Sequence, residues 1–312
     1  MRDDSATRRL AARIVPEEGG PGRLPPLLQA MRPRQWAKNV FVFAGIVFAG
    51  RLFEVRAQLA ALFVFVLFCC AASAVYLAND VADRAADVQH PVKRLRAIAA
   101  GRLSPSVALL AAAFLATVAL AGARALSRET FAIVAAYLLS SLAYSFGLKR
   151  VFLLDVIVVA LGFVLRAAAG AAAVGAAISP WLLVCTFLLS LFLALGKRRN
   201  ELVLLGDDAS RHRSALGQYS LPLLDAWIGA LSGATIVSYA IYTQSQRTVE
   251  HFGTANLVYT VPFVVYGLFR YQHLVVRKDV GGDPGSVLAH DKAMWLTLLG
   301  WAVTAAAVIY GR

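Results

Sequence analysis

The sequence predicts an all-α membrane protein that crosses the bilayer several times. Of its 312 residues, 59% are hydrophobic, and the mean hydropathy is +0.65. A soluble domain of this length could not bury so much apolar surface in one core. Apolar stretches recur along the chain, and most approach the roughly 20 residues that a helix needs to cross the hydrocarbon core of a bilayer. Lipid is therefore the expected solvent for most of the chain.

Eight of these stretches predict transmembrane helices, and a ninth is shorter. The eight cover residues 58–78, 106–123, 129–146, 153–176, 181–195, 222–243, 256–269 and 293–310. The ninth, Val40–Phe53, directly follows Lys38 and Asn39 and begins close to Trp36, a residue type that is frequent at the membrane interface. Counting it gives nine transmembrane helices.

The distribution of basic residues predicts the orientation. If the N-terminus is cytoplasmic and nine helices alternate, the inner segments hold 24 of the 31 Lys and Arg residues and the outer segments hold 6, with Arg166 inside a span. This asymmetry follows the positive-inside rule. The basic residues behind the net charge of +13 then lie mostly at the ends of the spans, where they meet anionic lipid headgroups. We therefore do not expect nucleic-acid binding. The three cysteines lie in predicted spans without zinc-like spacing, so we expect them to pack as small apolar residues.

The remaining polar segments divide the chain into a tail and one membrane domain. Residues 1–24 lack apolar periodicity and predict a flexible cytoplasmic tail. Residues 25–312 predict a single transmembrane domain with long inner loops at about 80–104 and 197–220. Because the acidic residues gather in the inner segments, polar groups collect on one side of the membrane. This favours an enzyme that acts on a cytosolic phosphate compound over a channel.

An acidic motif at the end of the second span is the main candidate site. If the helix continues, Asn79, Asp80, Asp83 and Asp87 fall within about 100° of one another, because successive residues are 100° apart. Like charges at this spacing repel by roughly 0.2–0.5 kcal/mol per pair. Mg²⁺ would explain the arrangement, since it takes carboxylate, water and phosphate oxygens. The motif predicts a Mg²⁺ site formed by these four residues, with the three aspartates catalytic; the alternative is a solvated acidic helix end.

Basic residues complete the predicted site. Lys93, Arg94 and Arg96 follow the acidic motif, where they could bind phosphate groups or simply mark the topology. Asp155 is costly within a span unless it is paired, so we expect it to orient a cation, with Lys149 or Arg166 as its partner. The further candidates for phosphate binding are Lys38, Tyr144, Lys149, Arg166, Lys197 and Arg198.

Three motifs resemble the UbiA superfamily of intramembrane prenyltransferases. The matched positions are Asn79, Asp83 and Asp87 in the family's first aspartate-rich motif (NxxxDxxxD), Tyr144 to Lys149 followed by Asp155 in its YSxxLK segment, and Arg166 to Gly170 in its RxxxG helix. The resemblance runs from about Arg32 to the C-terminus. It implies a UbiA-like bundle with a polar site that faces the cytoplasm.

The second aspartate motif of the aromatic-substrate members is missing from the sequence. After the sixth span the chain reads Lys-Arg-Arg-Asn-Glu from Lys197 to Glu201, without the DxxxD spacing. This pattern and the segment Arg32–Asn39 are similar to the decaprenyl-phosphate phosphoribosyltransferase branch. The resemblance implies that Asn39 and Glu201 bind substrate and that the enzyme transfers 5-phosphoribose from phosphoribosyl diphosphate to a polyprenyl phosphate in the cell membrane. It also implies a role in making precursors of cell-wall arabinan.

Two other functions remain open. An aromatic polyprenyltransferase of quinone biosynthesis would consume a prenyl diphosphate, and the missing DxxxD spacing counts against it. A transporter would use the same cationic pocket without chemistry. Phosphoribosyl transfer needs no strong general base because the acceptor phosphate is already anionic, and this agrees with five scattered histidines that share no spacing.

Overall fold

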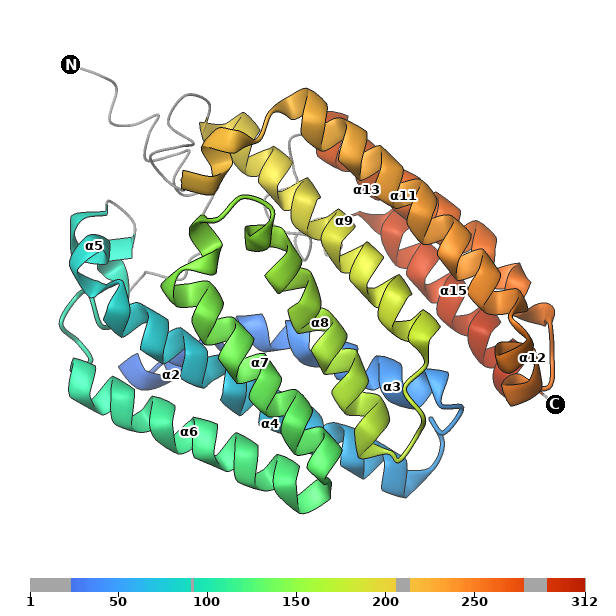
Figure 1. Ribbon diagram of the computed structural model, residues 1–312, viewed down its shortest axis with the longest axis horizontal. Coiled ribbons are helices and arrows are strands. Elements are labelled where there is room, and N and C mark those ends of the chain that lie inside the picture. Colours follow the sequence, from blue (N-terminus) through green and yellow to red (C-terminus); the bar gives the residue numbers. More distant parts are fainter. Residues whose placement is uncertain (1–23, 91–92, 206–213, 278–290, 312) are drawn as a thin grey trace. The chain divides into compact units, whose positions relative to one another are not determined.

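The protein is helical throughout the part of the chain that the structure describes, as the sequence predicts (Figure 1). This computed structural model describes residues 24–90, 93–205, 214–277 and 291–311, and no strand occurs within them. The predicted tail therefore lies, apart from Leu24, outside the described residues, as do parts of the predicted inner loops.

The helices follow one another in this order: α2 (Pro26–Met31), η1 (Pro33–Phe41, a 3-10 helix), α3 (Val42–Phe48), α4 (Val55–Ala82), α5 (Arg84–Gln89), η2 (Lys93–Leu95), α6 (Pro105–Leu126), α7 (Arg128–Phe146), η3 (Leu148–Arg150), α8 (Leu154–Ala173), α9 (Pro180–Leu205), η5 (Ser214–Gln218), α11 (Leu221–Gln244), α12 (Gln246–Phe252), η6 (Asn256–Thr260), α13 (Val261–Arg277) and α15 (Lys292–Tyr310). They form two compact units. The first contains the described residues up to Lys149 together with Leu161–Ile178, and the second contains Arg150–Ala160 and the described residues from Ser179 onward.

Several helices begin at side-chain caps. The hydroxyl of Ser104 accepts a hydrogen bond from the backbone N–H of Val107 at the start of α6, which also has a proline in its first turn. Ser127, the only residue between α6 and α7, caps α7 through the N–H of Thr130. Such caps satisfy backbone donors that the first turn of a helix leaves unpaired. They fix where these long apolar helices begin.

The core of the first unit is built on α4. This helix packs along α6 and α7, and its Val64 and Phe68 are fully buried. Where α8 meets η1 and α3, Gly170 lies so close to the backbone that an added Cβ would stand 1.9 Å from the carbonyl oxygen of Val42. A glycine at this position therefore permits the close packing of the two helices.

The second unit has its own core between α9, α11, α13 and α15. Phe192, Leu224 and Ile228 are almost completely buried there, and Phe192 packs against the ring of Tyr271 at a centroid distance of 5.3 Å. This core is continuous with the start of α8 through Val156. Aliphatic and aromatic side chains thus hold these helices together.

Seven of the described helices are long and apolar enough to cross a membrane, and one bent pair would make an eighth. The seven are α4, α6, α7, α8, α9, α11 and α15, and the pair joins α12 to the helical segment Asn256–Val276 at an angle of 99°. All eight long stretches in the sequence coincide with one of these. The shorter stretch Val40–Phe53 forms only the seven residues of α3 as α-helix, after η1, and does not qualify as a span.

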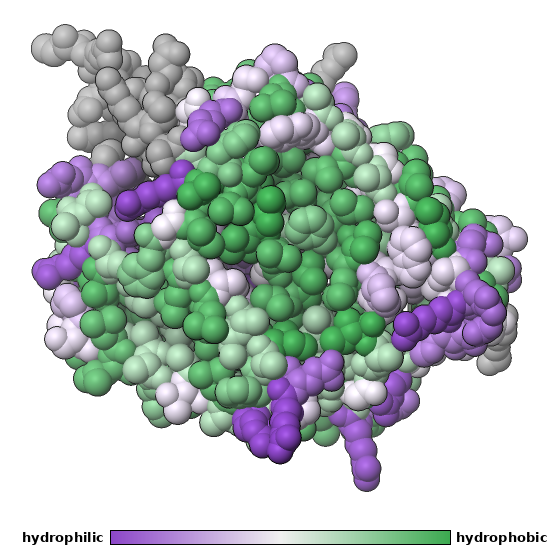
Figure 2. Space-filling view, viewed as in Figure 1, coloured by the Kyte–Doolittle hydropathy of each residue, from purple (hydrophilic) through white to green (hydrophobic). Residues whose placement is uncertain are grey.

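Large apolar side chains cover the outside of these helices. Leu110, Leu139 and Leu296 are each about 70% exposed, and Figure 2 shows hydrophobic residues over most of the face that it draws. Exposed leucine at this density is unusual for a surface in water. It is what helices that face lipid require.

Candidate functional site

The acidic motif lies where α4 ends and α5 begins. The helix does not run through it unbroken, because Asp83 has φ −86° and ψ 0° and separates the two helices. Backbone hydrogen bonds from Asp83 N to Asn79 O (2.8 Å) and from Asp87 N to Asp83 O (2.9 Å) still span the break. The helical register therefore continues closely enough to keep the four side chains at one end of α4.

Asp80 and Asp87 form one pair, joined by Arg96. The guanidinium of Arg96 lies 3.3 Å from Asp80 Oδ1 and 2.7 Å from Asp87 Oδ2. Asp80 also accepts a hydrogen bond from Arg32 at 2.6 Å. Both aspartates are only 3% exposed. Buried carboxylates are costly without partners, and the two arginines meet that requirement here.

Asn79 and Asp83 form the second pair, joined by Lys149. The amide of Asn79 donates to Asp83 Oδ2 at 3.1 Å. The Lys149 ammonium lies 3.0 Å and 3.3 Å from the two oxygens of Asp83 and 3.4 Å from Asn79 Oδ1. We call these three oxygens the oxygen cradle. The side chain of Asp83 is 31% exposed, so the cradle is open to solvent while the first pair is closed.

Lys93 adds a further positive charge beside both pairs. Burial, and after it the neighbouring Arg96, hold the pKa of Lys93 below the ordinary lysine value, while Asp87 and Asp83 oppose that shift. Four cations thus face three carboxylates at this end of α4, namely Arg32, Lys93, Arg96 and Lys149. The excess of positive charge suits an anionic ligand. Arg94, the remaining candidate of this loop, is exposed.

Arg32 belongs to this cluster although the motif spacing did not single it out. Its backbone has φ 54°, which is rare for a residue with a side chain, and it links α2 to η1. Its guanidinium reaches Asp80 and also stacks 5.0 Å from the ring centroid of Tyr76. In the sequence, the only indication of a role for Arg32 is its position in the basic segment before the first predicted span. Strained backbone of this kind is often found at functional sites.

Arg166 is enclosed within the first unit. It is 6% exposed and donates to Asn39 Oδ1 (2.7 Å), to the Gly162 carbonyl (2.7 Å) and to the Tyr137 hydroxyl (2.9 Å). The rings of Tyr137, Phe163 and Phe68 lie 4.6–5.8 Å from its guanidinium carbon. Within the described residues it forms no ion pair. These contacts tie α8 to η1, and they support a structural role for Arg166 and Asn39.

Lys38 and Tyr144, the other candidates in this unit, are both half-buried. Lys38 lies in η1, directly before Asn39, and Tyr144 lies in the last turn of α7. The first unit therefore brings together the acidic motif, Lys93, Arg96 and Lys149 from the predicted set, and it places Arg166 and Asn39 in a separate buried cluster.

Asp155, Arg198 and Glu201 meet in the second unit. Arg198 Nε donates to Asp155 at 2.7 Å, and its Nη1 pairs with Glu201. The Tyr219 hydroxyl donates to Asp155 Oδ1 at 2.6 Å and accepts from the backbone N–H of Leu153 at 3.3 Å. Burial, and after it the hydrogen bond to Asp155, raise the pKa of Tyr219. Asp155 was expected to pair with Lys149 or Arg166, but the cation that pairs with it is Arg198, which comes from a different helix.

Lys197 and Arg199 flank this group on α9. Lys197 is half-buried. Arg199 pairs with Asp225 at 2.5 Å and donates to the carbonyl of Val275 at 3.1 Å, so it joins α9 to α11 and α13. Asp225 is a partner that the sequence offered no reason to choose, because it comes from a different helix.

The oxygen cradle fits a hard divalent cation. Among the described residues no group of three or more His, Cys, Asp or Glu side chains is arranged to hold a metal ion. However, an amide and a carboxylate already surround one cation, the Lys149 ammonium, with three oxygens. Oxygen ligands of this kind suit Mg²⁺, which usually binds one or two carboxylates and completes its shell with water and phosphate.

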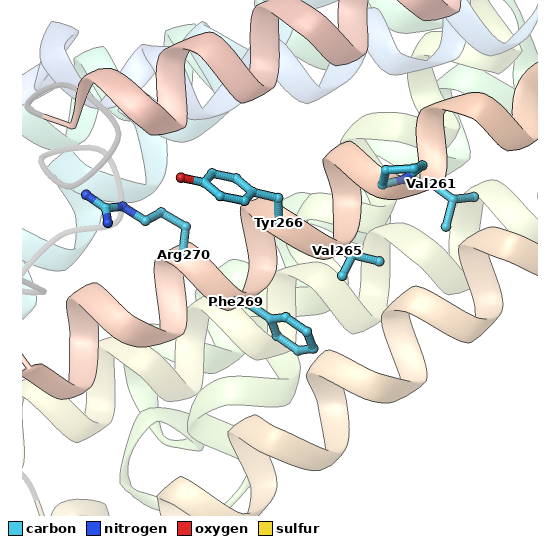
Figure 3. A pocket seen from close by; sticks show the side chains of 6 residues that line it. Val261, Val265, Tyr266, Phe269 and Arg270 are labelled. Carbon is cyan, nitrogen blue, oxygen red and sulfur yellow. The ribbon is translucent and has the colours of Figure 1, made fainter.

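A separate cavity of about 530 Å³ lies along α13. It is lined by Val261, Pro262, Val265, Tyr266, Phe269 and Arg270. Figure 3 shows Tyr266 and Arg270 extending toward the same side of the helix. Because no carboxylate lines this mostly apolar cavity, it is not a candidate for metal binding.

Comparisons with known proteins agree with the motifs. Residues 39–287 match the model of the UbiA prenyltransferase family. The chain is 35% identical to a decaprenyl-phosphate phosphoribosyltransferase of Corynebacterium glutamicum over 91% of this chain and 86% of that protein. It is 34% identical to the protein of that name from Mycolicibacterium smegmatis over 94% of this chain and 97% of the relative.

A solved structure shares the fold. A UbiA homolog from Archaeoglobus fulgidus, bound to DMAPP and Mg²⁺, superposes with a TM-score of 0.67 at 17% sequence identity and covers 91% of this chain and 98% of its own. At this identity the likeness shows the fold alone. With its family match spanning most of the apolar helices, the chain is a multi-pass membrane protein that belongs to the UbiA prenyltransferase family.

Proposed function

We propose that the protein is a Mg²⁺-dependent phosphoribosyltransferase that moves 5-phosphoribose from phosphoribosyl diphosphate to a polyprenyl phosphate such as decaprenyl phosphate. The products would be polyprenylphosphoryl-5-phosphoribose and diphosphate, and the lipid product would serve as a precursor of cell-wall arabinan. The observation that carries this proposal is the cluster of four cations and an oxygen cradle at the end of α4. Relatives at about 35% identity that carry this activity in their names support it.

The charge of the cluster favours a substrate rich in phosphate. A donor with a diphosphate and a 5-phosphate meets an acceptor that is itself a phosphate, so several anions must come together. Arg96 and Lys93 would neutralise them beside the carboxylates, and arginine can donate two parallel hydrogen bonds to one phosphate. An aromatic acceptor would need no such excess of cations.

In the reaction, the bond between C1 of the ribose and the diphosphate oxygen breaks, and a phosphate oxygen of the acceptor forms the new bond to C1. Asn79, Asp83 and Asp87 would hold Mg²⁺, which supplies charge neutralisation to the diphosphate leaving group. Asp80, closed by Arg32 and Arg96, would support the position of those arginines. Since the acceptor oxygen is already anionic, the side chains need only position the reactants and stabilise charge.

Within the second unit, a candidate for phosphate contacts is Arg198, whose guanidinium pairs with Asp155. Lys197 and Glu201 lie beside it on α9, and Lys38 and Tyr144 are the remaining candidates for phosphate contacts in the first unit. Their roles rest on the resemblance of the motifs. We further propose nine membrane crossings, with η1 and α3 providing the first, in the inner membrane and with the N-terminus and the site facing the cytoplasm.

The test is transfer of label into lipid. Purified protein with Mg²⁺, decaprenyl phosphate and phosphoribosyl diphosphate labelled in the ribose should give a labelled lipid. Asp83→Asn and Asp87→Asn should each lower kcat by at least about a hundredfold, the scale of losing a main electrostatic contact. A matched control is Glu54→Gln, which removes an exposed acid outside the cluster. Label that stays entirely in water-soluble products would contradict the proposal.

A further inference from the structure

The oxygen cradle already contains a cation, and that cation comes from the protein. Lys149 Nζ lies within 3.4 Å of all three oxygens of the cradle. An ammonium has three N–H donors, which is the number of oxygens that surround it. Lys149 therefore contacts two of the three side chains to which the metal was assigned above, Asn79 and Asp83.

Lys149 can leave the cradle at low cost. It lies in η3, a 3-10 helix of only three residues, and its side chain is 22% exposed. A lysine side chain is a flexible stem with a compact, well-hydrated charge, so it can turn from one anion to another. By contrast, the Arg96 guanidinium joins two aspartates that are almost completely buried.

We propose that Lys149 is an exchangeable occupant of the metal position. With no substrate bound, its ammonium holds Asp83 and Asn79 in place. When the donor arrives with its metal, the ammonium moves from the cradle to a phosphate oxygen of the same diphosphate. This inference rests on the proposed function, and it adds a link between two events: metal binding releases the lysine that then binds the phosphate.

The exchange has a consequence that a fixed phosphate-binding lysine would not have. In the absence of phosphate, Lys149 and a divalent cation compete for the same three oxygens, so removing the lysine should strengthen metal binding. In the presence of diphosphate, Lys149 helps to hold the anion, so removing it should weaken the binding of the metal and diphosphate together. The effect of one substitution should change sign with the ligand.

The experiment measures Mn²⁺ binding to the purified full-length chain by electron paramagnetic resonance, with Mn²⁺ alone and with Mn²⁺ and inorganic diphosphate. Lys149→Met should bind Mn²⁺ alone about fivefold more tightly than the unchanged protein, the ratio expected when one partly exposed ion pair no longer competes. With diphosphate present, the same variant should bind Mn²⁺ more weakly than the unchanged protein. Lys149→Arg, which keeps the charge, should stay closer to the unchanged protein under both conditions.

Arg84→Met is the matched control, because Arg84 is exposed, follows Asp83 directly and carries the same charge. If Arg84→Met strengthens Mn²⁺ binding as much as Lys149→Met does, the loss of any nearby positive charge explains the result, and the proposal that Lys149 exchanges with the metal is wrong. Lys149→Gln serves as the second variant if Lys149→Met does not fold.

Asp83→Asn separates the inference from the proposed function. If it leaves Mn²⁺ binding unchanged, the metal is elsewhere and the proposed site is wrong. If it abolishes binding while Lys149→Met binds Mn²⁺ no more tightly than the unchanged protein, the site stands and only the exchange is overturned.

Discussion

At the scale of single residues, every carboxylate of the acidic motif is neutralised by a side chain from outside the motif. Arg32 comes from the segment before η1, Arg96 from the loop after α5, and Lys149 from the segment after α7. Each ion pair places a cation that could bind phosphate next to a carboxylate oxygen that could bind the metal. The two buried carboxylates, Asp80 and Asp87, are held in place by arginines before a substrate arrives, which is the form of preorganisation that favours catalysis.

The spacing of Asn79, Asp83 and Asp87 could be predicted from the sequence because a helix fixes the angle between residues four apart. Their partners could not be predicted in the same way. Asp83 and Lys149 are 66 residues apart, and Arg32 and Asp80 are 48 apart, so their pairing depends on how whole helices pack. Tyr219 was missed for the same reason, since it lies 64 residues from Asp155 along the chain.

Lys93→Met should stabilise the protein and weaken donor binding. The pKa of Lys93 is lowered in the folded state, mainly by burial. At pH values below that lowered pKa, Lys93 is charged in both the folded and the unfolded protein, and burial of its charge lowers the free energy of unfolding by the full amount. This loss of stability disappears as the pH rises through the pKa of the unfolded protein, about 10.4. Thermal unfolding in detergent should therefore show a higher Tm than the unchanged protein at pH 7 and a smaller difference at high pH. The KM for phosphoribosyl diphosphate should rise.

Lys292→Met is the control for this change, because Lys292 is an exposed lysine at the start of α15. It should leave both Tm and KM unchanged. A Lys93→Met protein that is less stable than the unchanged one at pH 7 would show that Lys93 contributes more through its ion pairs than its burial costs.

Tyr219→Phe should destabilise the second unit. The hydroxyl is a donor to Asp155 and an acceptor for the N–H of Leu153, a residue held at φ 66°. Its loss leaves the buried Asp155 carboxylate and the half-buried N–H of Leu153 without this partner, at a cost of about 1–3 kcal/mol. Urea or thermal unfolding of the purified protein measures the change. Tyr259→Phe, at a tyrosine that is 64% exposed, should have little effect, and equal losses in the two variants would contradict the role given to Tyr219.

At the scale of elements, η1 is held along its length against α4 and α8. Trp36 donates to the Ser73 hydroxyl at 3.1 Å, and Asn39 donates to the sulfur of Cys69 at 3.3 Å while accepting from Arg166. The sequence indicated a surface anchor at Trp36 and substrate contacts at Asn39. Both side chains have partners inside the first unit, and these contacts fix the segment that carries Arg32 and Lys38.

Gly170→Ala should separate α8 from the start of α3. An added Cβ would lie 1.9 Å from the carbonyl oxygen of Val42, which belongs to the backbone and cannot move alone. Overpacking of this kind costs about 1–3 kcal/mol or more. Gly229→Ala provides the control, because nothing lies within 4 Å of the Cβ it would add. Thermal unfolding should show a lower Tm for Gly170→Ala alone, and equal Tm values for the two variants would contradict the close approach of α8 to Val42.

At the scale of the whole molecule, the length of each apolar stretch in the sequence was sufficient to find the long spans. A span needs only enough consecutive apolar residues, so α4 or α15 can be recognised without knowing what it contacts. The stretch Val40–Phe53 is different, because the chain turns at Gly50, which has φ 67°, and α3 ends at Phe48. The shape of this short segment depends on its packing, which residue composition does not report.

The proposed topology can be tested by labelling cysteines in intact cells. Arg124→Cys should react with a membrane-impermeant maleimide added outside, because Arg124 is exposed in the last turn of α6 at the proposed outer side. Arg94→Cys, exposed in η2 near the acidic motif, should react only after the cells are opened. Labelling of Arg94→Cys from outside would reverse the orientation and move the site away from a cytosolic donor.

The most direct measurement is the position of the metal in crystals grown with Mn²⁺ and phosphoribosyl diphosphate, located by anomalous scattering. We expect a peak bonded to oxygens of Asp83 and Asn79 or Asp87 and to the diphosphate, with Lys149 turned toward a phosphate. Donor bound in the protein with Mn²⁺ in contact with none of these three side chains would contradict the assignment of the site.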